Sequence, residues 1–153
     1  MNEIPAVEVM GADGPIALDR VGAPLVVYFY PKDDTSGCTR EAQDFSALAE
    51  RFGEAGTRVI GVSKDSVASH EKFSAKYGLT VELASDESGA ACEAFGTWVE
   101  KSMYGRKYMG VDRATFLFDA DGRLLAEWRK VKVPGHAQAV LKAATEKLAG
   151  ESA

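Results

Sequence analysis

The sequence has only two cysteines, Cys38 and Cys92, among its 153 residues. Two thiols are too few for the disulfide framework of a small secreted protein, and they lack the clustered spacing of a zinc site. Positive charge is not in excess either, since 18 Lys and Arg against 23 Asp and Glu give a formal net charge of −5. The chain therefore lacks the excess of positive charge that binds nucleic acid or a membrane surface, and we expect a small soluble partner.

Long apolar segments and targeting signals are also missing. The longest apolar run, Pro24 to Pro31, is far shorter than the roughly 20 residues of a membrane helix. The first residues show no positively charged segment followed by an apolar one, so we expect no signal peptide and a cytoplasmic, reducing location. Because no repeat or linker divides the chain, residues 1–153 are expected to form one domain, and no phosphate loop or metal cluster suggests a cofactor or a metal.

Alternation of apolar runs with turn residues predicts an α/β fold. Strands are expected at 25–30, 58–63, 81–84, 114–118 and 124–128, helices at 37–54, 67–77, 88–95 and from Pro134 onward, and an N-terminal hairpin of 7–9 with 16–18. This order describes a mixed central sheet flanked by helices, and a thioredoxin-like fold matches it.

Cys38 has a distinctive place in this pattern, directly after the strand 25–30 and in the first turn of the helix 37–54. Open α/β sheets place their ligand sites beyond the carboxyl ends of strands. A thiol there meets the positive end of the helix dipole and unpaired backbone N–H groups, which favour the nucleophilic thiolate. Position alone leaves a buried structural cysteine as the alternative.

The segment around Cys38 carries a motif. Residues 28–41, YFYPKDDTSGCTRE, resemble the active-site segment of peroxiredoxins, whose Pro-x-x-x-Thr-x-x-Cys pattern is here Pro31, Thr35 and Cys38. The longer match is similar to the bacterioferritin comigratory protein branch, also called peroxiredoxin Q, and it continues through residues 85–122. The resemblance implies thiol-dependent reduction of hydrogen peroxide and organic hydroperoxides.

The resemblance also implies a role for each residue of the motif. Cys38 attacks a peroxide oxygen and becomes a sulfenic acid, while the Thr35 hydroxyl donates a hydrogen bond to the peroxide. The backbone N–H groups of Gly37 and Cys38 would add donors, and Pro31 would screen the sulfur from water.

Two charged residues complete the implied site. Arg113, in VDRATFLFD, matches a second family motif and would supply positive charge to the thiolate and to the developing oxyanion. Glu41 would hold an arginine in place. Ser36 departs from the branch, which commonly has proline there, so we expect a more mobile Cys38.

The sulfenic acid must then react with a second thiol. Branch members often have this thiol five or about 36 residues after the first, and these positions are Gln43 and Ser74 here. Cys92 is expected to be a buried thiol. We therefore expect a one-cysteine mechanism with an external donor, either thioredoxin or glutaredoxin with glutathione, and keep resolution by Cys92 as the alternative.

The same residues bear on two other kinds of function. A thioredoxin-type disulfide oxidoreductase is disfavoured because it needs Cys-x-x-Cys, whereas the residues three before and after Cys38 are Thr35 and Glu41. A redox sensor or an oxidation-activated holdase would use the same thiolate and stays open. The resemblance favours a monomer over a dimer.

Several further residues have structural interpretations. We expect His70 and His136 to be solvated or capping residues rather than catalytic ones. Trp98, Tyr104 and Tyr108 are expected to pack in the core or in a loop, with a place at the peroxide entrance as the alternative.

Overall fold

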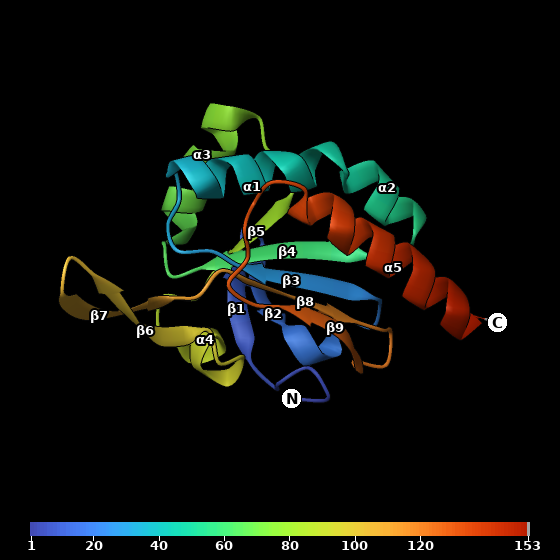
Figure 1. The fold of residues 1–153 in the computed structure, drawn as a ribbon. Coiled ribbons are helices and arrows are strands. Elements are labelled where there is room, and N and C mark those ends of the chain that lie inside the picture. Colours follow the sequence, from blue (N-terminus) through green and yellow to red (C-terminus); the bar gives the residue numbers. More distant parts are fainter. Residues whose placement is uncertain (153) are drawn as a thin grey trace.

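The computed structural model describes residues 1–152, with side chains through Ala149. A seven-stranded sheet in the order β2-β1-β5-β4-β3-β8-β9 forms its centre, and a separate two-stranded sheet pairs β6 with β7 (Figure 1). The strands are β1 (Glu8–Gly11), β2 (Gly14–Ala17), β3 (Leu25–Phe29), β4 (Arg58–Ser63), β5 (Glu82–Ser85), β6 (Trp98–Met103), β7 (Arg106–Val111), β8 (Ala114–Phe118) and β9 (Leu124–Trp128). The helices are α1 (Ser36–Ala47), α2 (Ala49–Glu54), α3 (Val67–Tyr77), α4 (Ala90–Ala94) and α5 (His136–Ser152), and a 3-10 turn spans Leu18–Arg20.

The centre of the sheet is parallel and its flanks are antiparallel. β4 pairs in parallel with β3 and with β5, whereas β8 runs antiparallel to β3 and β1 runs antiparallel to β5. Every residue of β3 and of β8 is buried, which is why each of these strands is a continuous apolar run rather than an alternating one. The result is the expected thioredoxin-like fold, with the β1–β2 hairpin at one edge of the mixed sheet.

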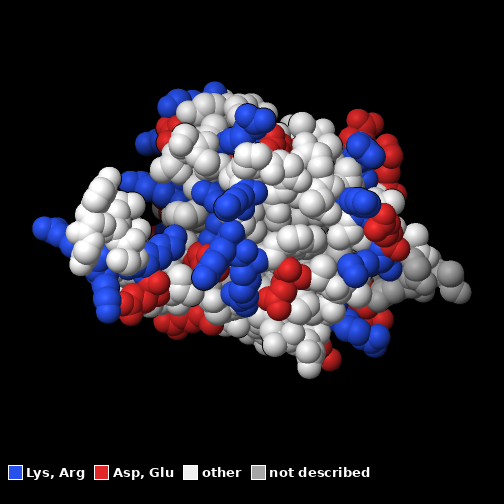
Figure 2. Space-filling view, in the orientation of Figure 1, with Lys and Arg blue, Asp and Glu red and all other residues white. Residues whose placement is uncertain are grey.

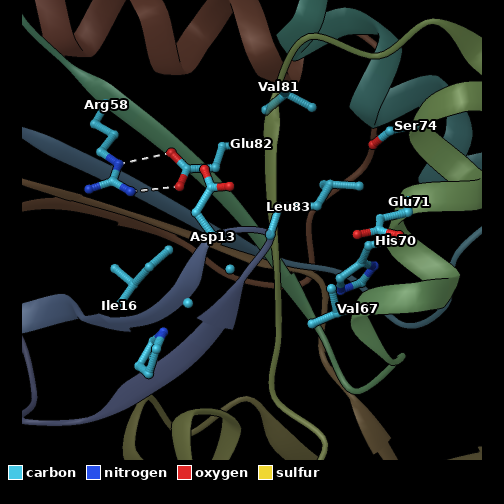
Figure 3. A pocket seen from close by; sticks show the side chains of 14 residues that line it. Asp13, Ile16, Arg58, Val67, His70, Glu71, Ser74, Val81, Glu82 and Leu83 are labelled. Atoms are coloured by element: carbon cyan, nitrogen blue, oxygen red, sulfur yellow. Dashed lines mark hydrogen bonds and ion pairs between the residues drawn. The ribbon is translucent and has the colours of Figure 1, made fainter.

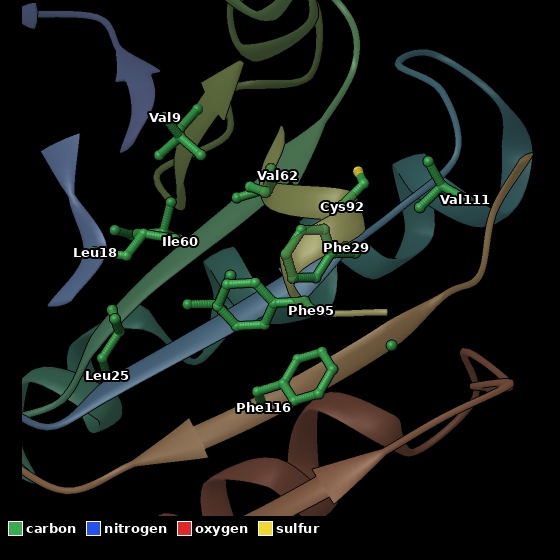
Figure 4. Packing of buried hydrophobic residues seen from close by; sticks show 14 of the residues in the cluster. Val9, Leu18, Leu25, Phe29, Ile60, Val62, Cys92, Phe95, Val111 and Phe116 are labelled. Carbon is green, nitrogen blue, oxygen red and sulfur yellow. The ribbon is translucent and has the colours of Figure 1, made fainter. Parts of the chain in front are cut away.

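The sheet separates two hydrophobic cores. Val26 and Tyr28 of β3 contact a cluster that includes residues of α1, α2, α3 and α5. Leu25, Val27 and Phe29 point the other way, into a cluster that includes residues of α4 (Figure 4). Figure 1 shows the same layers, with the four longer helices on one side of the sheet and α4 on the other. Each cysteine belongs to a different core, Cys38 to the first and Cys92 to the second.

The chain departs from the sequence prediction mainly at two places, apart from element ends that differ by one or two residues, such as α5, which begins at His136 rather than at Pro134. The single helix expected at 37–54 is divided at Leu48, whose φ of −102° and ψ of 3° leave the helical region, so that α2 starts in a new direction. The β6–β7 hairpin was not predicted. Its turn has Tyr104 at φ 51° and Gly105 at φ 78°. The paired strands β6 and β7 form the arm that projects from the rest of the protein in Figure 1.

No helix within residues 1–152 is long and apolar enough to cross a membrane.

Candidate active site

Cys38 lies where the sequence analysis expected a reactive thiol. It is the third residue of α1, just beyond the end of the buried strand β3, and its side chain belongs to the core beneath that helix. The residue is only 2% exposed and forms no disulfide. The first turn of a helix leaves backbone N–H groups without intrahelical partners, so the sulfur lies near several donors and the positive end of the dipole.

Arg113 brings a positive charge to this sulfur. Its Nη2 donates to Cys38 Sγ at 3.3 Å, and its Nη1 donates to Glu41 Oε1 at 2.7 Å. Burial alone would lower the pKa of Arg113, but the neighbouring Glu41 and Cys38 raise it above its ordinary value. The guanidinium is therefore a permanent cation that connects the sulfur to a carboxylate.

Gly37 makes this approach of Arg113 possible. A Cβ atom built on Gly37 would lie 3.2 Å from Arg113 Nη2, closer than an ordinary van der Waals contact. A side chain at this position would require the guanidinium to shift by a few tenths of an ångström. The glycine therefore belongs to the geometry of the site as much as the arginine does.

Glu41 is the buried end of the same connection. Its side chain is 1% exposed, and Oε2 has no hydrogen-bond partner among the described residues. Burial raises the Glu41 pKa to about 7, although Arg113 opposes this shift. Because the carboxyl titrates near neutral pH, the charge beside Arg113 changes within the physiological range.

Thr35 and Pro31 are exposed residues of the segment that precedes α1. Thr35 is the N-cap residue of α1, and its hydroxyl donates to the carbonyl oxygen of Lys32 at 2.8 Å. The hydroxyl proton is therefore engaged, and the hydroxyl could donate to a peroxide only by giving up the bond to Lys32. Donation by Thr35 and screening by Pro31 stay predictions.

The loop before α1 is held by a buried network that the sequence analysis missed. Asp33 accepts hydrogen bonds from the Tyr30 hydroxyl at 2.6 Å and the Ser69 hydroxyl at 2.8 Å, and its Oδ2 lies 2.7 Å from His70 Nδ1. The other ring nitrogen of His70 lies 3.0 Å from the carbonyl oxygen of Ala84. These bonds fasten the loop to α3 and to β5.

The expectation that His70 and His136 are solvated or capping residues was wrong. His70 is 4% exposed and His136 is 7% exposed. Burial, with a smaller contribution from Arg113, lowers the His136 pKa to about 4, and its Nε2 lies 2.8 Å from the Thr115 hydroxyl. The spacing of His70 from Phe73, three residues on the same helix face, was the one sequence signal for its burial.

Cys92 is buried, as expected, on the opposite face of the sheet from Cys38. It lies in α4, and its backbone N–H donates to Asp86 Oδ2 at 2.8 Å. Burial first, and then Asp86, raise the Cys92 pKa to about 12, which keeps this thiol protonated. The central sheet separates the two sulfur atoms.

The two positions at which branch members carry a second thiol hold no sulfur here. Gln43 is exposed on α1. Ser74, on α3, lines a cavity of about 650 Å³ together with the turn of the β1–β2 hairpin (Figure 3). The Arg58–Glu82 ion pair lies at the same cavity, with an Nη2 to Oε2 distance of 2.6 Å.

The aromatic residues before Arg113 do not form one cluster. Trp98 packs against the core on the α4 side, as expected, whereas Tyr104 is 98% exposed and Tyr108 is 45% exposed. The prediction that the two tyrosines pack in the core or in a loop was therefore wrong, since both lie exposed on the β6–β7 hairpin. Within the part of the chain that the structure describes, no group of three or more His, Cys, Asp or Glu residues could hold a metal ion.

Comparisons with known proteins agree with this geometry. A family model described as the AhpC/TSA family matches residues 2–126. The chain is 53% identical to Peroxiredoxin Bcp of Xanthomonas campestris pv. campestris over 119 residues, which are 78% of this chain and 74% of that protein. It is 48% identical to Peroxiredoxin Bcp of Bacillus subtilis over 124 residues, 81% of this chain and 79% of that one.

Solved structures give the same result. The bacterioferritin comigratory protein of Xanthomonas campestris, studied for its alkyl peroxide reduction activity, superposes with a TM-score of 0.89 at 45% identity. The match covers 97% of this chain and 98% of that one. A PrxQ mutant of Xylella fastidiosa superposes with a TM-score of 0.86 at 38% identity, over 100% of this chain and 98% of that one.

Proposed function

Since this chain belongs to the AhpC/TSA family and is a peroxiredoxin of the Bcp/PrxQ type, we propose that Cys38 is the thiolate that reduces its peroxide substrates. Hydrogen peroxide and organic hydroperoxides are the proposed substrates. The observation that carries the proposal is the contact of Arg113 with both Cys38 Sγ and Glu41.

The proposed reaction forms one bond and breaks one. The Cys38 thiolate attacks the terminal peroxide oxygen, the O–O bond breaks, and the alkoxide or hydroxide leaves and takes up a proton. Cys38 is oxidised to a sulfenic acid and the peroxide is reduced to an alcohol or water. Negative charge moves from sulfur to the leaving oxygen, so fixed donors along that line lower the barrier.

The residues around Cys38 have separate proposed roles in the reduction of the peroxide. Arg113 stabilises the thiolate and then the leaving oxygen, and Glu41 holds the guanidinium in position. The N–H groups at the start of α1 and the hydroxyl of Thr35 are the proposed contacts for the peroxide oxygens, and Pro31 limits water at the sulfur. The burial of Cys38 supports access by a small substrate rather than a large one.

The sulfenic acid is proposed to be reduced by an external thiol. A Cys38–Cys92 disulfide would require the two sulfurs to meet across the central sheet, because they belong to cores on its opposite faces. The buried, protonated state of Cys92 also makes it a poor nucleophile. We propose a one-cysteine cycle in a monomer.

The test compares three proteins by turnover and by intact mass under non-reducing conditions. Cys92→Ser is expected to keep turnover with a small-thiol reductant and to show sulfenic acid or a donor adduct on Cys38. Cys38→Ser is expected to lose turnover. A stoichiometric Cys38–Cys92 disulfide in the parent, with turnover lost in Cys92→Ser, would overturn the one-cysteine cycle, and activity in Cys38→Ser would overturn the role of Cys38.

A further inference from the structure

Positive charge gathers on the two loops that adjoin the Cys38 site, in a chain whose net charge is −5. Three exposed lysines, Lys32, Lys130 and Lys132, form what we call the basic rim. Figure 2 shows Lys and Arg side chains gathered near the centre of the visible face, over the loop that joins β9 to α5 in Figure 1. None of the ion pairs found among the described residues uses a lysine of the rim.

Backbone contacts tie the rim to the site. The N–H of Val131 donates to the carbonyl oxygen of Arg113 at 2.9 Å, so the loop is anchored beside the residue that contacts Cys38. Val131 is half-buried and its neighbours Lys130 and Lys132 are exposed, with Lys130 in the left-handed region at φ 49°. Lys32 belongs to the loop before α1, where its carbonyl oxygen accepts a hydrogen bond from the Thr35 hydroxyl.

Three carboxylates that lie close to the rim lysines in the sequence are engaged with other groups. Asp34 pairs with Lys76 at 2.8 Å, Glu127 pairs with Arg129 at 3.2 Å, and Asp33 is buried in the network with His70. Asp34 and Glu127 therefore pair with cations outside the rim, and Asp33 is held in its own hydrogen-bond network, so these three carboxylates leave the rim lysines free to attract a negatively charged molecule.

Oxidation of Cys38 strengthens this attraction. The thiolate contributes one negative charge beside Arg113, whereas the sulfenic acid is neutral. The site therefore gains one unit of positive charge at the step at which the second thiol must arrive. That thiol reacts as a thiolate, and a carboxylate on the same molecule would add to the attraction.

The burial of Cys38 indicates how large the thiol reductant is. Cys38 is 2% exposed and lies in the first turn of α1. A thiol on a small molecule can enter such a site with less displacement of the helix than a thiol carried on a folded protein surface.

We propose that the external reductant is a small thiol that carries one or more carboxylates and is drawn in by the basic rim. This inference rests on the proposed function, in which an external thiol reduces the Cys38 sulfenic acid. The incoming thiolate attacks the Cys38 sulfur, an S–S bond forms, the S–O bond breaks, and hydroxide leaves. A second thiolate then displaces Cys38 as a thiolate and leaves with the first as an oxidised disulfide.

The test measures the two half-reactions separately. Cys38 is first oxidised with one equivalent of hydrogen peroxide. The sulfenic acid is then reduced with mercaptosuccinate, 3-mercaptopropionate, 2-mercaptoethanol or cysteamine, which range from dianionic to cationic apart from the thiol. Rate constants are divided by the thiolate fraction of each reagent. We expect the order from mercaptosuccinate, fastest, to cysteamine, slowest, with about a tenfold span at low salt that shrinks in about 1 M salt.

Charge reversal locates the effect. The double variant Lys130→Glu/Lys132→Glu is expected to lose most of the preference for mercaptosuccinate over cysteamine. The matched control Lys142→Glu/Lys147→Glu makes the same change in net charge at exposed positions of α5 and should keep the parent's preference.

The outcomes separate this inference from the proposed function. Equal thiolate-normalised rates, or equal losses in both double variants, would overturn the inference while leaving the oxidation of Cys38 intact. Faster reduction by a dithiol protein than by any of the four reagents at equal concentration would also overturn it. Failure of peroxide to form a sulfenic acid on Cys38 would instead overturn the proposed function.

Discussion

Arg113 Nη2 lies 3.3 Å from Cys38 Sγ, although 75 positions separate the two residues along the chain. β3 and β8 are paired, with Phe29 opposite Ala114, and this register brings the residue before β8 to the loop that follows β3. The charge at the thiol therefore depends on the pairing of two buried strands as well as on the helix that carries the cysteine.

Removal of the Arg113 charge should slow the first half-reaction. Arg113→Met is expected to lower the rate constant for oxidation of Cys38 by about 100-fold, the usual effect of losing one fixed donor to a developing oxyanion. Arg113→Lys should lose less, because it keeps the charge but cannot contact Cys38 and Glu41 together. Quenched-flow mass measurement of the sulfenic acid checks both, and a parent-like rate in Arg113→Met would contradict the role of Arg113.

Gly37→Ala should separate stability from activity. Alanine has the higher helix propensity, so the free energy of unfolding is expected to stay level or rise by up to about 1 kcal/mol. The new Cβ would lie 3.2 Å from Arg113 Nη2 and should displace the guanidinium, so oxidation of Cys38 should slow by about tenfold. Denaturant unfolding and the oxidation rate measure the two effects. An unchanged rate would show that Arg113 does not need its present position.

Glu41 should make the folded state less stable as the pH rises. Its folded pKa of about 7 is above the ordinary 4.5, so the native state binds the extra proton between these values. The contribution is fully present below pH 4.5 and is lost as the pH rises through 7, by about 3 kcal/mol in total. Glu41→Gln should remove this slope in urea titrations performed across that range. An unchanged slope would mean that Arg113 keeps the carboxylate charged.

His136 should make the folded state less stable as the pH falls, opposite to the effect of Glu41. Its folded pKa of about 4 is below the ordinary 6.5, so stability is present above pH 6.5 and is lost as the pH falls towards 4, by roughly 3 kcal/mol. His136→Gln keeps a hydrogen-bonding group near Thr115 and should flatten this loss. The variant is compared with the parent over the same pH range. A parent-like slope in His136→Gln would contradict the assignment.

Sequence patterns predicted the buried parts of the fold best. The bounds of β4, α3, β8 and β9 agree with the ranges expected from apolar runs and turn residues. The β6–β7 hairpin escaped prediction because its strands project from the core and carry mixed polar and apolar residues. A tyrosine also occupies a positive-φ turn position at which glycine, asparagine or aspartate is the usual signal.

The candidate site was predictable where a motif existed and not elsewhere. Cys38, Arg113 and Glu41 belong to recognisable segments, and the structure brings the three side chains together. His70 was missed because polar neighbours on α3 hide its inward position, and its partner Asp33 is 37 residues away. A pairing of this kind depends on tertiary contacts, which local patterns do not encode.

The division of the two cysteines between opposite cores has a practical consequence. Cys38 lies in the first turn of a helix, where fraying can expose it locally, whereas Cys92 becomes accessible only when the core on the other side of the sheet opens. Alkylation by a thiol reagent should therefore proceed at two separate rates in one molecule. The faster alkylation, at Cys38, would report local fraying of the first turn of α1. The slower alkylation, at Cys92, would report global unfolding, so one experiment on the unmodified sequence measures both processes.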